Sequence, residues 1–147
     1  MIGVFALCLL LQNPTPDSHV WERYSVVGKQ HWTASVTQAD IDEAPKWELA
    51  ASDAPPLSPG EAIRAARTLM QKLTLESATG KWHVGSDGVS LHPASHGWIY
   101  IVNFEDSPQG CEPPPGSIGC GASWGSSGGM NIIVLMSGRA IVPVLKQ

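Results

Sequence analysis

Three histidines in the second half of the chain have a residue type and a spacing that could do chemistry. His92 and His96 lie four residues apart, and His83 precedes them. Imidazole nitrogens bind zinc and copper, so a fold that brought the three together would make a metal site. Pro93 and Gly97 put the last two in a turn, where exposed histidines without a ligand are the commoner finding. A small metal-dependent enzyme or metal-binding protein is therefore the alternative interpretation.

A serine in GASWGSSGGM matches the bare letters of a hydrolase nucleophile motif, as Gly121-x-Ser123-x-Gly125. That motif requires a strand before the serine and a helix after it, and here Gly- and Ser-rich sequence lies on both sides. The acidic stretch QADIDEAP (38–45) lacks the ligand spacing of a calcium loop. The sequence therefore predicts no catalytic residues and no cofactor.

Cys111 and Cys120 bracket the Pro- and Gly-rich segment CEPPPGSIGC. No histidine lies close enough in the sequence to complete a zinc site with them. In an exported protein we expect them to form a disulfide, and two free thiols are the alternative. The Cys-flanked loop at 107–129 is a candidate functional segment, because binding residues often lie on such loops. Trp124 within it is a candidate partner contact.

The first 17 residues are expected to be a signal peptide that is truncated at its start. An apolar run at 2–11 is too short to span a membrane, which takes about 20 residues, and a polar segment with prolines follows it. No basic residue precedes the run, and a misplaced start codon would explain this. No A-x-A cleavage site follows the run. A buried N-terminal strand is the alternative. The expected location is secreted or periplasmic, without a stable membrane span.

The length and composition favour one folded domain without a nucleic-acid partner. The chain has 147 residues, of which 43% are hydrophobic and 15% charged, as in a chain with a packed core. Its net charge is −4 and its basic residues are scattered, whereas binding to phosphates requires clustered Lys and Arg.

The stretch PPLSPGEAIRAARTLMQKL (55–73) predicts a helix with a complete start signal. Ser58 is a good N-cap, Pro59 suits the first helical position, and Glu61 completes a capping box. One face is apolar at helical spacing and should cover a sheet; it consists of Ala62, Ile63, Ala66, Leu69, Met70 and Leu73.

Strands are expected after this helix. GWIYIVNFED (97–106) is the clearest strand, whereas KWHVGSDGVSL (81–91) is either one strand with a bulge or a tight hairpin. Two last strands should meet at residues 137–138, and Pro143 marks the second as an edge or as ending there. The predicted fold of 55–147 is therefore α+β, with a single helix on a curled antiparallel sheet of about four strands. Residues 18–54 are expected to be an N-terminal arm or extra strands.

The strand at 97–106 has two apolar faces. If the helix covers the face with Tyr100 and Phe104, something else must cover the face with Ile99 and Ile101. The N-terminal arm is one candidate and a partner is the other. Ile99 and Ile101 are therefore candidate partner contacts, together with Trp124.

Three segments together resemble PepSY-type and related cystatin-like small exported domains. They are LSPGEAIRAARTLMQKL, WIYIVNFED and NIIVLMSGRAIVPV, and the resemblance covers about residues 47–145. It implies a non-catalytic module, often associated with extracellular peptidases as an inhibitory or folding element. The protease-binding Q-x-V-x-G hairpin of true cystatins is absent as such, because VVGKQ (26–30) has its letters in another order. The Pro-Trp loop of true cystatins is also absent as such, because Pro45-Lys46-Trp47 lies before the helix. The family has no defined catalytic motif, so no site residue carries over.

The preferred interpretation is a non-catalytic exported module that binds a protein or peptide. A structural envelope protein is a further alternative, beside the three-histidine metal protein.

Overall fold

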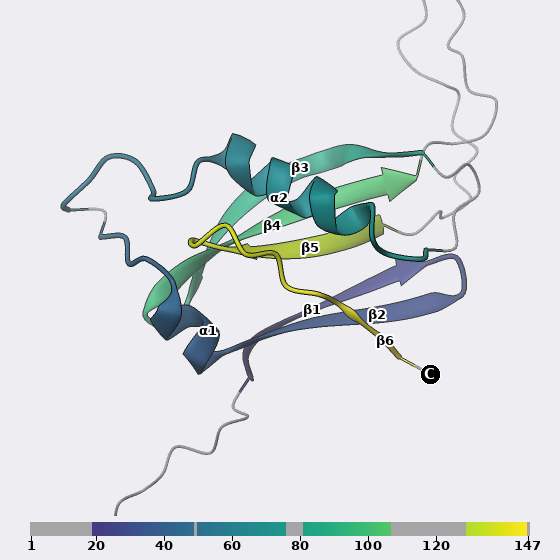
Figure 1. Cartoon of the computed structure of the whole chain (residues 1–147), viewed down its shortest axis with the longest axis horizontal. Coiled ribbons are helices and arrows are strands. Elements are labelled where there is room, and N and C mark those ends of the chain that lie inside the picture. Colours follow the sequence, from purple (N-terminus) through teal and green to yellow (C-terminus); the bar gives the residue numbers. More distant parts are fainter. Residues whose placement is uncertain (1–18, 49, 76–80, 107–128, 147) are drawn as a thin grey trace, which may run out of the picture.

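The computed structural model describes residues 19–48, 50–75, 81–106 and 129–146 (Figure 1). In chain order the described elements are β1 (His19–Val27), β2 (Gln30–Thr37), α1 (Gln38–Glu43), α2 (Pro59–Met70), β3 (Trp82–Ala94), β4 (Gly97–Asp106), β5 (Gly129–Leu135) and β6 (Val144–Lys146). They form two antiparallel sheets of three strands each. Sheet A has the order β1-β2-β6, and sheet B has the order β3-β4-β5.

The α+β prediction of one helix on a sheet of about four strands was wrong. The described residues form mostly sheet, with six strands in two sheets and two helices. Two segments account for the difference. Residues 19–37 form a hairpin of their own, and residues 144–146 pair with that hairpin, not with β5.

The β1–β2 hairpin turns at Gly28, whose φ of +58° lies in the left-handed region that glycine tolerates best. Its inner face carries Ser25 and Val27 from β1 opposite Trp32 and Gln30 from β2. Ser25, Val27 and Trp32 are buried, because this face of the hairpin packs into the core. The segment left open as an arm or extra strands therefore supplies two strands.

β3 is one strand with a bulge and not a hairpin. It pairs with β4 throughout, and the register shifts between Val84 and Val89, where the GSDG stretch lies. Gly88 has a φ of +60°, and a Cβ at Gly85 would collide with the side chains of Asn103 and Glu105. Gly88 therefore suits its left-handed backbone conformation, and Gly85 leaves room for the side chains of Asn103 and Glu105 beside the bulge.

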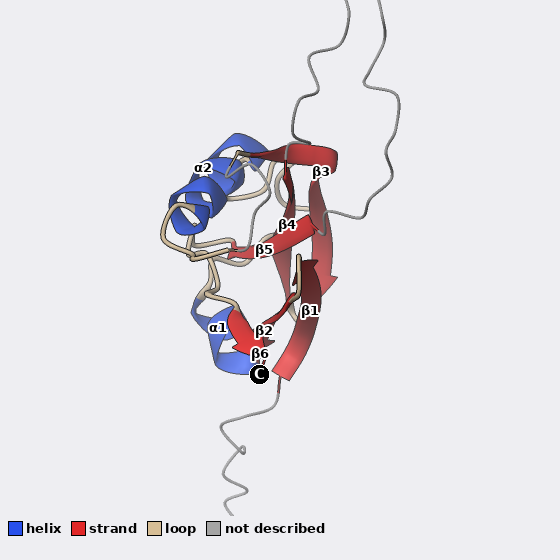
Figure 2. Cartoon of the chain, turned by 90° about the vertical axis from the view of Figure 1, so that its right-hand side faces the viewer, coloured by secondary structure: helices blue, strands red, loops and turns tan. Residues whose placement is uncertain are grey.

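α2 confirms the predicted helix start. The Ser58 hydroxyl accepts from the Glu61 backbone N–H at 3.3 Å, and Glu61 accepts from the Ser58 N–H at 2.9 Å. The face with Ala62, Ala66 and Met70 is buried against β4 and β5. Both helices lie on the same side of the strands (Figure 2).

The chain end crosses from one sheet to the other. After β5 a turn at Gly138 starts a return beside β5, with a bond from the Ile141 N–H to the Ile133 carbonyl at 2.9 Å. The return ends before Pro143, which has no N–H to donate. The chain then pairs with β2 as β6, so the predicted last hairpin forms only in its first residues.

Two polar contacts join the sheets and the short helix. The Asn131 backbone N–H on β5 donates to Ser25 Oγ on β1 at 2.9 Å, where the two sheets lie side by side. The Arg139 guanidinium, in the turn after β5, pairs with Asp40 in α1. Asp40 also completes a capping box with Thr37. No helix among the described residues is long and apolar enough to cross a membrane.

Candidate functional site

The exposed large apolar side chains of the described chain gather on sheet A and the segment leading into β6. We call this set the edge patch; it consists of Tyr24, Val26, Val142, Val144 and Leu145. Apolar side chains scattered singly over a surface are ordinary, whereas a group on neighbouring strands marks an interaction surface. The edge patch is therefore the first candidate for a binding site.

Strand register brings three members of the edge patch together on one face of sheet A. Tyr24 on β1 and Val144 on β6 are both paired with Thr33 of the central strand β2, so they flank it on one face. Val26 lies two residues after Tyr24 and points to the same face. Thr33 between them is only 5% exposed, while Tyr24 and Val144 are 65% and 64% exposed.

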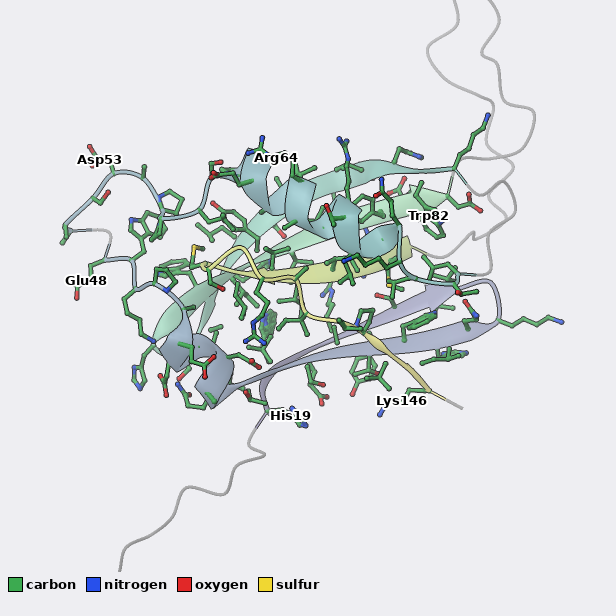
Figure 3. The ribbon with its side chains drawn as sticks, in the orientation of Figure 1. His19, Glu48, Asp53, Arg64, Trp82 and Lys146 are labelled. Atoms are coloured by element: carbon green, nitrogen blue, oxygen red, sulfur yellow. The ribbon has the colours of Figure 1, made fainter. Side chains whose placement is uncertain are left out.

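β6 is the outer strand of sheet A and pairs only with β2 among the described residues. Val144 and Leu145 point to opposite faces of the strand, and both are exposed. Lys146, labelled in Figure 3, ends the strand at the border of the molecule. The far edge of β6 therefore offers backbone donors and acceptors between exposed apolar side chains, as a sheet edge that accepts another strand does.

A charged group, the carboxylate of Glu22, lies beside Tyr24 of the edge patch. The Tyr24 hydroxyl donates to Glu22 at 2.9 Å, and Ser35 Oγ donates to the same carboxylate at 3.3 Å. The bond from Tyr24 chiefly lowers the pKa of Glu22, with a smaller contribution from Ser35, so the group is charged at neutral pH. Tyr24 is 65% exposed, so most of its side chain stays accessible while its hydroxyl is bonded to Glu22.

A pocket of about 450 Å³ lies elsewhere, where α2 ends near the start of β3 and the end of β4. Its apolar lining consists of Met70, Leu73, Leu75, Trp82 and Phe104, and Arg67 and Gln71 add polar groups. Trp82 is labelled at this end of the molecule in Figure 3. The volume lies within the range of small-molecule sites, about 300–1,000 Å³.

The structure does not bring the three histidines together. His83 pairs in register with Glu105 near one end of β4 and His92 with Ile99 near the other, six residues apart along that strand. At about 3.3 Å per residue that separation is roughly 20 Å, too far for one metal ion. His92 instead contacts Trp21, with ring centroids 5.6 Å apart, and Ser90 at 2.8 Å. No group of three metal-binding side chains occurs in the described ranges.

His83, Ser86 and Glu105 do come together, but in the wrong order for a serine nucleophile. Ser86 Oγ donates to Glu105 Oε1 at 3.2 Å, and His83 Nε2 lies 4.0 Å from Glu105 Oε2. In a catalytic triad the histidine lies between the serine and the carboxylate, whereas here the carboxylate lies between the other two. This cluster holds the β3 bulge against β4.

The candidate contacts Ile99 and Ile101 are 0% and 4% exposed. Trp21 of β1 packs on His92, which is the register partner of Ile99, so residues before 54 take part in covering this face. Neither isoleucine presents a surface to a partner. Trp124, Ser123 and the expected Cys111–Cys120 disulfide lie outside the described residues, as does the expected signal peptide.

A row of amides runs across sheet B to sheet A. Asn103 Nδ2 donates to Asn131 Oδ1 at 3.3 Å, and Asn131 Nδ2 lies 3.4 Å from Ser25 Oγ. Gly129 keeps room for this row, since a Cβ there would lie 3.1 Å from Asn103 Nδ2. Asn103 and Asn131 are register partners, so the row links two strands of sheet B to β1 of sheet A.

Comparison of the chain with protein families, curated proteins and solved structures finds no match. The resemblance to PepSY-type and cystatin-like domains therefore stays a prediction.

Sequence reasoning missed the edge patch. In the sequence, Val142, Val144 and Leu145 look like part of a last strand, and Tyr24 and Val26 like a short apolar alternation in an arm. The signal that could have identified the patch is Pro143, which ends pairing with β5 and leaves the following valine and leucine without an assigned neighbour.

Proposed function

We propose that this chain is a non-catalytic exported module that binds an extended segment of another protein along β6. The observation that carries the proposal is the edge patch: all exposed large apolar side chains among the described residues lie on β1, β6 and the residue before Pro143. An extended segment added to β6 would form backbone hydrogen bonds with the edge of β6 that faces away from β2.

The same face supplies side-chain contacts for such a segment. Alternate residues of an added strand would face Val144, with Tyr24 and Val26 beyond it across β2. The expected partner therefore carries apolar residues at every second position. Export remains part of the proposal on the sequence grounds of the apolar run at 2–11 and of Cys111 and Cys120, which we expect to form a disulfide.

The test is a selection of linear peptides displayed on phage against the purified chain, followed by affinity measurement with Val144→Lys. Burying a valine contributes about 1.5–3 kcal/mol, so the variant should lose about tenfold or more in affinity. Ala51→Lys adds the same charge at an exposed residue in the loop between Glu48 and Asp53, at the opposite end of the molecule (Figure 3), and should bind like the wild type.

Hydrogen exchange gives a second reading. The β6 amides should exchange more slowly with peptide bound, because strand addition pairs them. Selected peptides without alternation, or equal affinities of Val144→Lys and Ala51→Lys, would contradict the proposal. Self-association that Val144→Lys removes would instead assign the edge patch to a second copy of the chain.

A further inference from the structure

We infer that the pocket at the end of α2 binds a small amphiphile with an apolar body and a carboxylate head. This site is independent of the peptide-binding proposal, because it is lined by α2, the residues that follow it, β3 and β4, and by no residue of sheet A.

The apolar part of the pocket is built from side chains that the fold already buries or half-buries. Phe104 is 1% exposed and Met70 is 8% exposed, so both are held by the core. Leu73, Leu75 and Trp82 are half-buried and pack against the same core. A preformed apolar wall of this kind favours a ligand that removes more apolar surface from water.

The polar part of the pocket lies on one side of the α2 end. Arg67 and Gln71 are four residues apart, so they are neighbours on the helix surface. Both are exposed, and no ion pair or hydrogen bond of either side chain is found among the described residues. Arg64, one turn earlier, is instead placed 4.0 Å from Glu61.

This arrangement selects the charge of the ligand. The described lining residues include a guanidinium and an amide but no carboxylate. A guanidinium binds a carboxylate through two parallel hydrogen bonds, and the amide N–H of Gln71 can donate a third. An anionic head over an apolar body therefore fits the pocket better than a cationic or a neutral one.

Arg67 has a competing role, because a cation in the last turn of a helix complements the helix dipole. That role predicts a small change in melting temperature for Arg67→Gln and no change in ligand affinity. Binding of a carboxylate by Arg67 predicts instead that Arg67→Gln chiefly lowers ligand affinity. Measuring the affinity therefore distinguishes the two roles of Arg67.

The experiment is calorimetric titration of the full chain with decanoate below its micelle concentration, with decanol as the uncharged probe of equal tail length. The wild type should bind decanoate saturably with one site. Arg67→Gln should weaken decanoate binding about tenfold and leave decanol binding unchanged. Arg64→Gln, the same substitution on the same helix outside the pocket, should bind decanoate like the wild type.

Two further readings connect the binding to the pocket. Bound decanoate should change the fluorescence of the wild type more than that of Trp82→Phe, because Trp82 lines the site. Affinity for decanoate should fall with added salt while affinity for decanol does not. Absence of saturable decanoate binding, or equal effects of Arg67→Gln and Arg64→Gln, would overturn the inference. Val144→Lys should bind decanoate normally, so failure of the peptide proposal would be seen separately.

Discussion

Replacing Asp40 by Asn should show how strongly α1 is fastened to the turn after β5. Asp40 Oδ2 accepts from both the backbone N–H and the hydroxyl of Thr37, each at 2.8 Å. Its Oδ1 accepts from the Arg139 guanidinium, ninety-nine residues further along the chain. The Asp40 side chain is 18% exposed and that of Arg139 is 52% exposed, so the pair is partly shielded from water. Asn keeps the shape of the side chain but removes the charge.

The magnitude follows from the bonds that weaken. Hydrogen bonds to charged groups contribute about 1.5–3 kcal/mol, and a neutral amide oxygen retains part of the bonding to Thr37. Because Arg139 is exposed to water, solvent screening reduces what its ion pair with Asp40 contributes to stability. We therefore expect the free energy of unfolding to fall by about 2 kcal/mol at neutral pH. For a chain of about 150 residues that corresponds to a melting temperature lower by about 4–8 °C.

The loss should depend on pH. Burial raises the pKa of Asp40, but bonds from the Thr37 backbone and side chain and from Arg139 outweigh burial, and the net pKa lies below the usual value of 3.8. A carboxyl with a lowered folded pKa stabilises the fold above its unfolded pKa, and this contribution is lost as pH falls through the folded pKa. The difference between wild type and Asp40→Asn should therefore be full above about pH 5 and shrink in acid.

Urea unfolding of both proteins across this pH range measures the effect. Asp42→Asn is the matched control, because Asp42 lies in the same helix but is 61% exposed, and its partners among the described residues are Lys46 at 3.5 Å and Gln38 at 2.9 Å. It should cost no more than about 0.5 kcal/mol. A double-mutant cycle with Arg139→Gln should give a coupling energy of about 1 kcal/mol. Equal losses of stability for the two Asp variants, or no coupling energy with Arg139, would refute this account of how Asp40 fastens α1 to the turn after β5.

Two further substitutions test the core and the junction of the sheets. Phe104→Ala should lower the free energy of unfolding by about 3–5 kcal/mol, because the ring is 1% exposed; a loss under 1 kcal/mol in denaturant titration would show that the site collapses around the gap. Ser25→Ala should cost about 1 kcal/mol and speed hydrogen exchange at the Asn131 amide, whose N–H loses its acceptor at a partly buried position. Unchanged exchange at Asn131 would mean that the two sheets do not depend on this bond.

The parts of the fold that were predictable from the sequence are those with local signals. α2 has its cap, proline and capping box within four residues, and β4 is a run of β-branched and aromatic residues typical of a strand. β1 lacked such a signal, because Ser25 and Val27 are its buried positions while Tyr24 and Val26 face solvent. Assigning the apolar residues Tyr24 and Val26 to the buried face would therefore give the wrong side of β1.

The candidate sites were less predictable, because each depends on contacts between distant residues. The pocket combines the end of α2 with Trp82 and Phe104, which are distant in sequence and each typical of a core. The metal hypothesis failed because the β3–β4 register places His83 and His92 at opposite ends of one strand pair. Spacing along the chain carries no information on register.

The pairing of β6 with β2 also determines the order in which this molecule can fold. The β1–β2 hairpin is local and can form early, but Thr33 finds its second partner, Val144, more than a hundred residues later. Contacts of such high contact order form slowly, because a long loop must close before the strand gains anything from pairing. During synthesis, one edge of β2 therefore stays open until Val144 has left the ribosome. Sheet A is the part of the fold that a chaperone would have most time to engage.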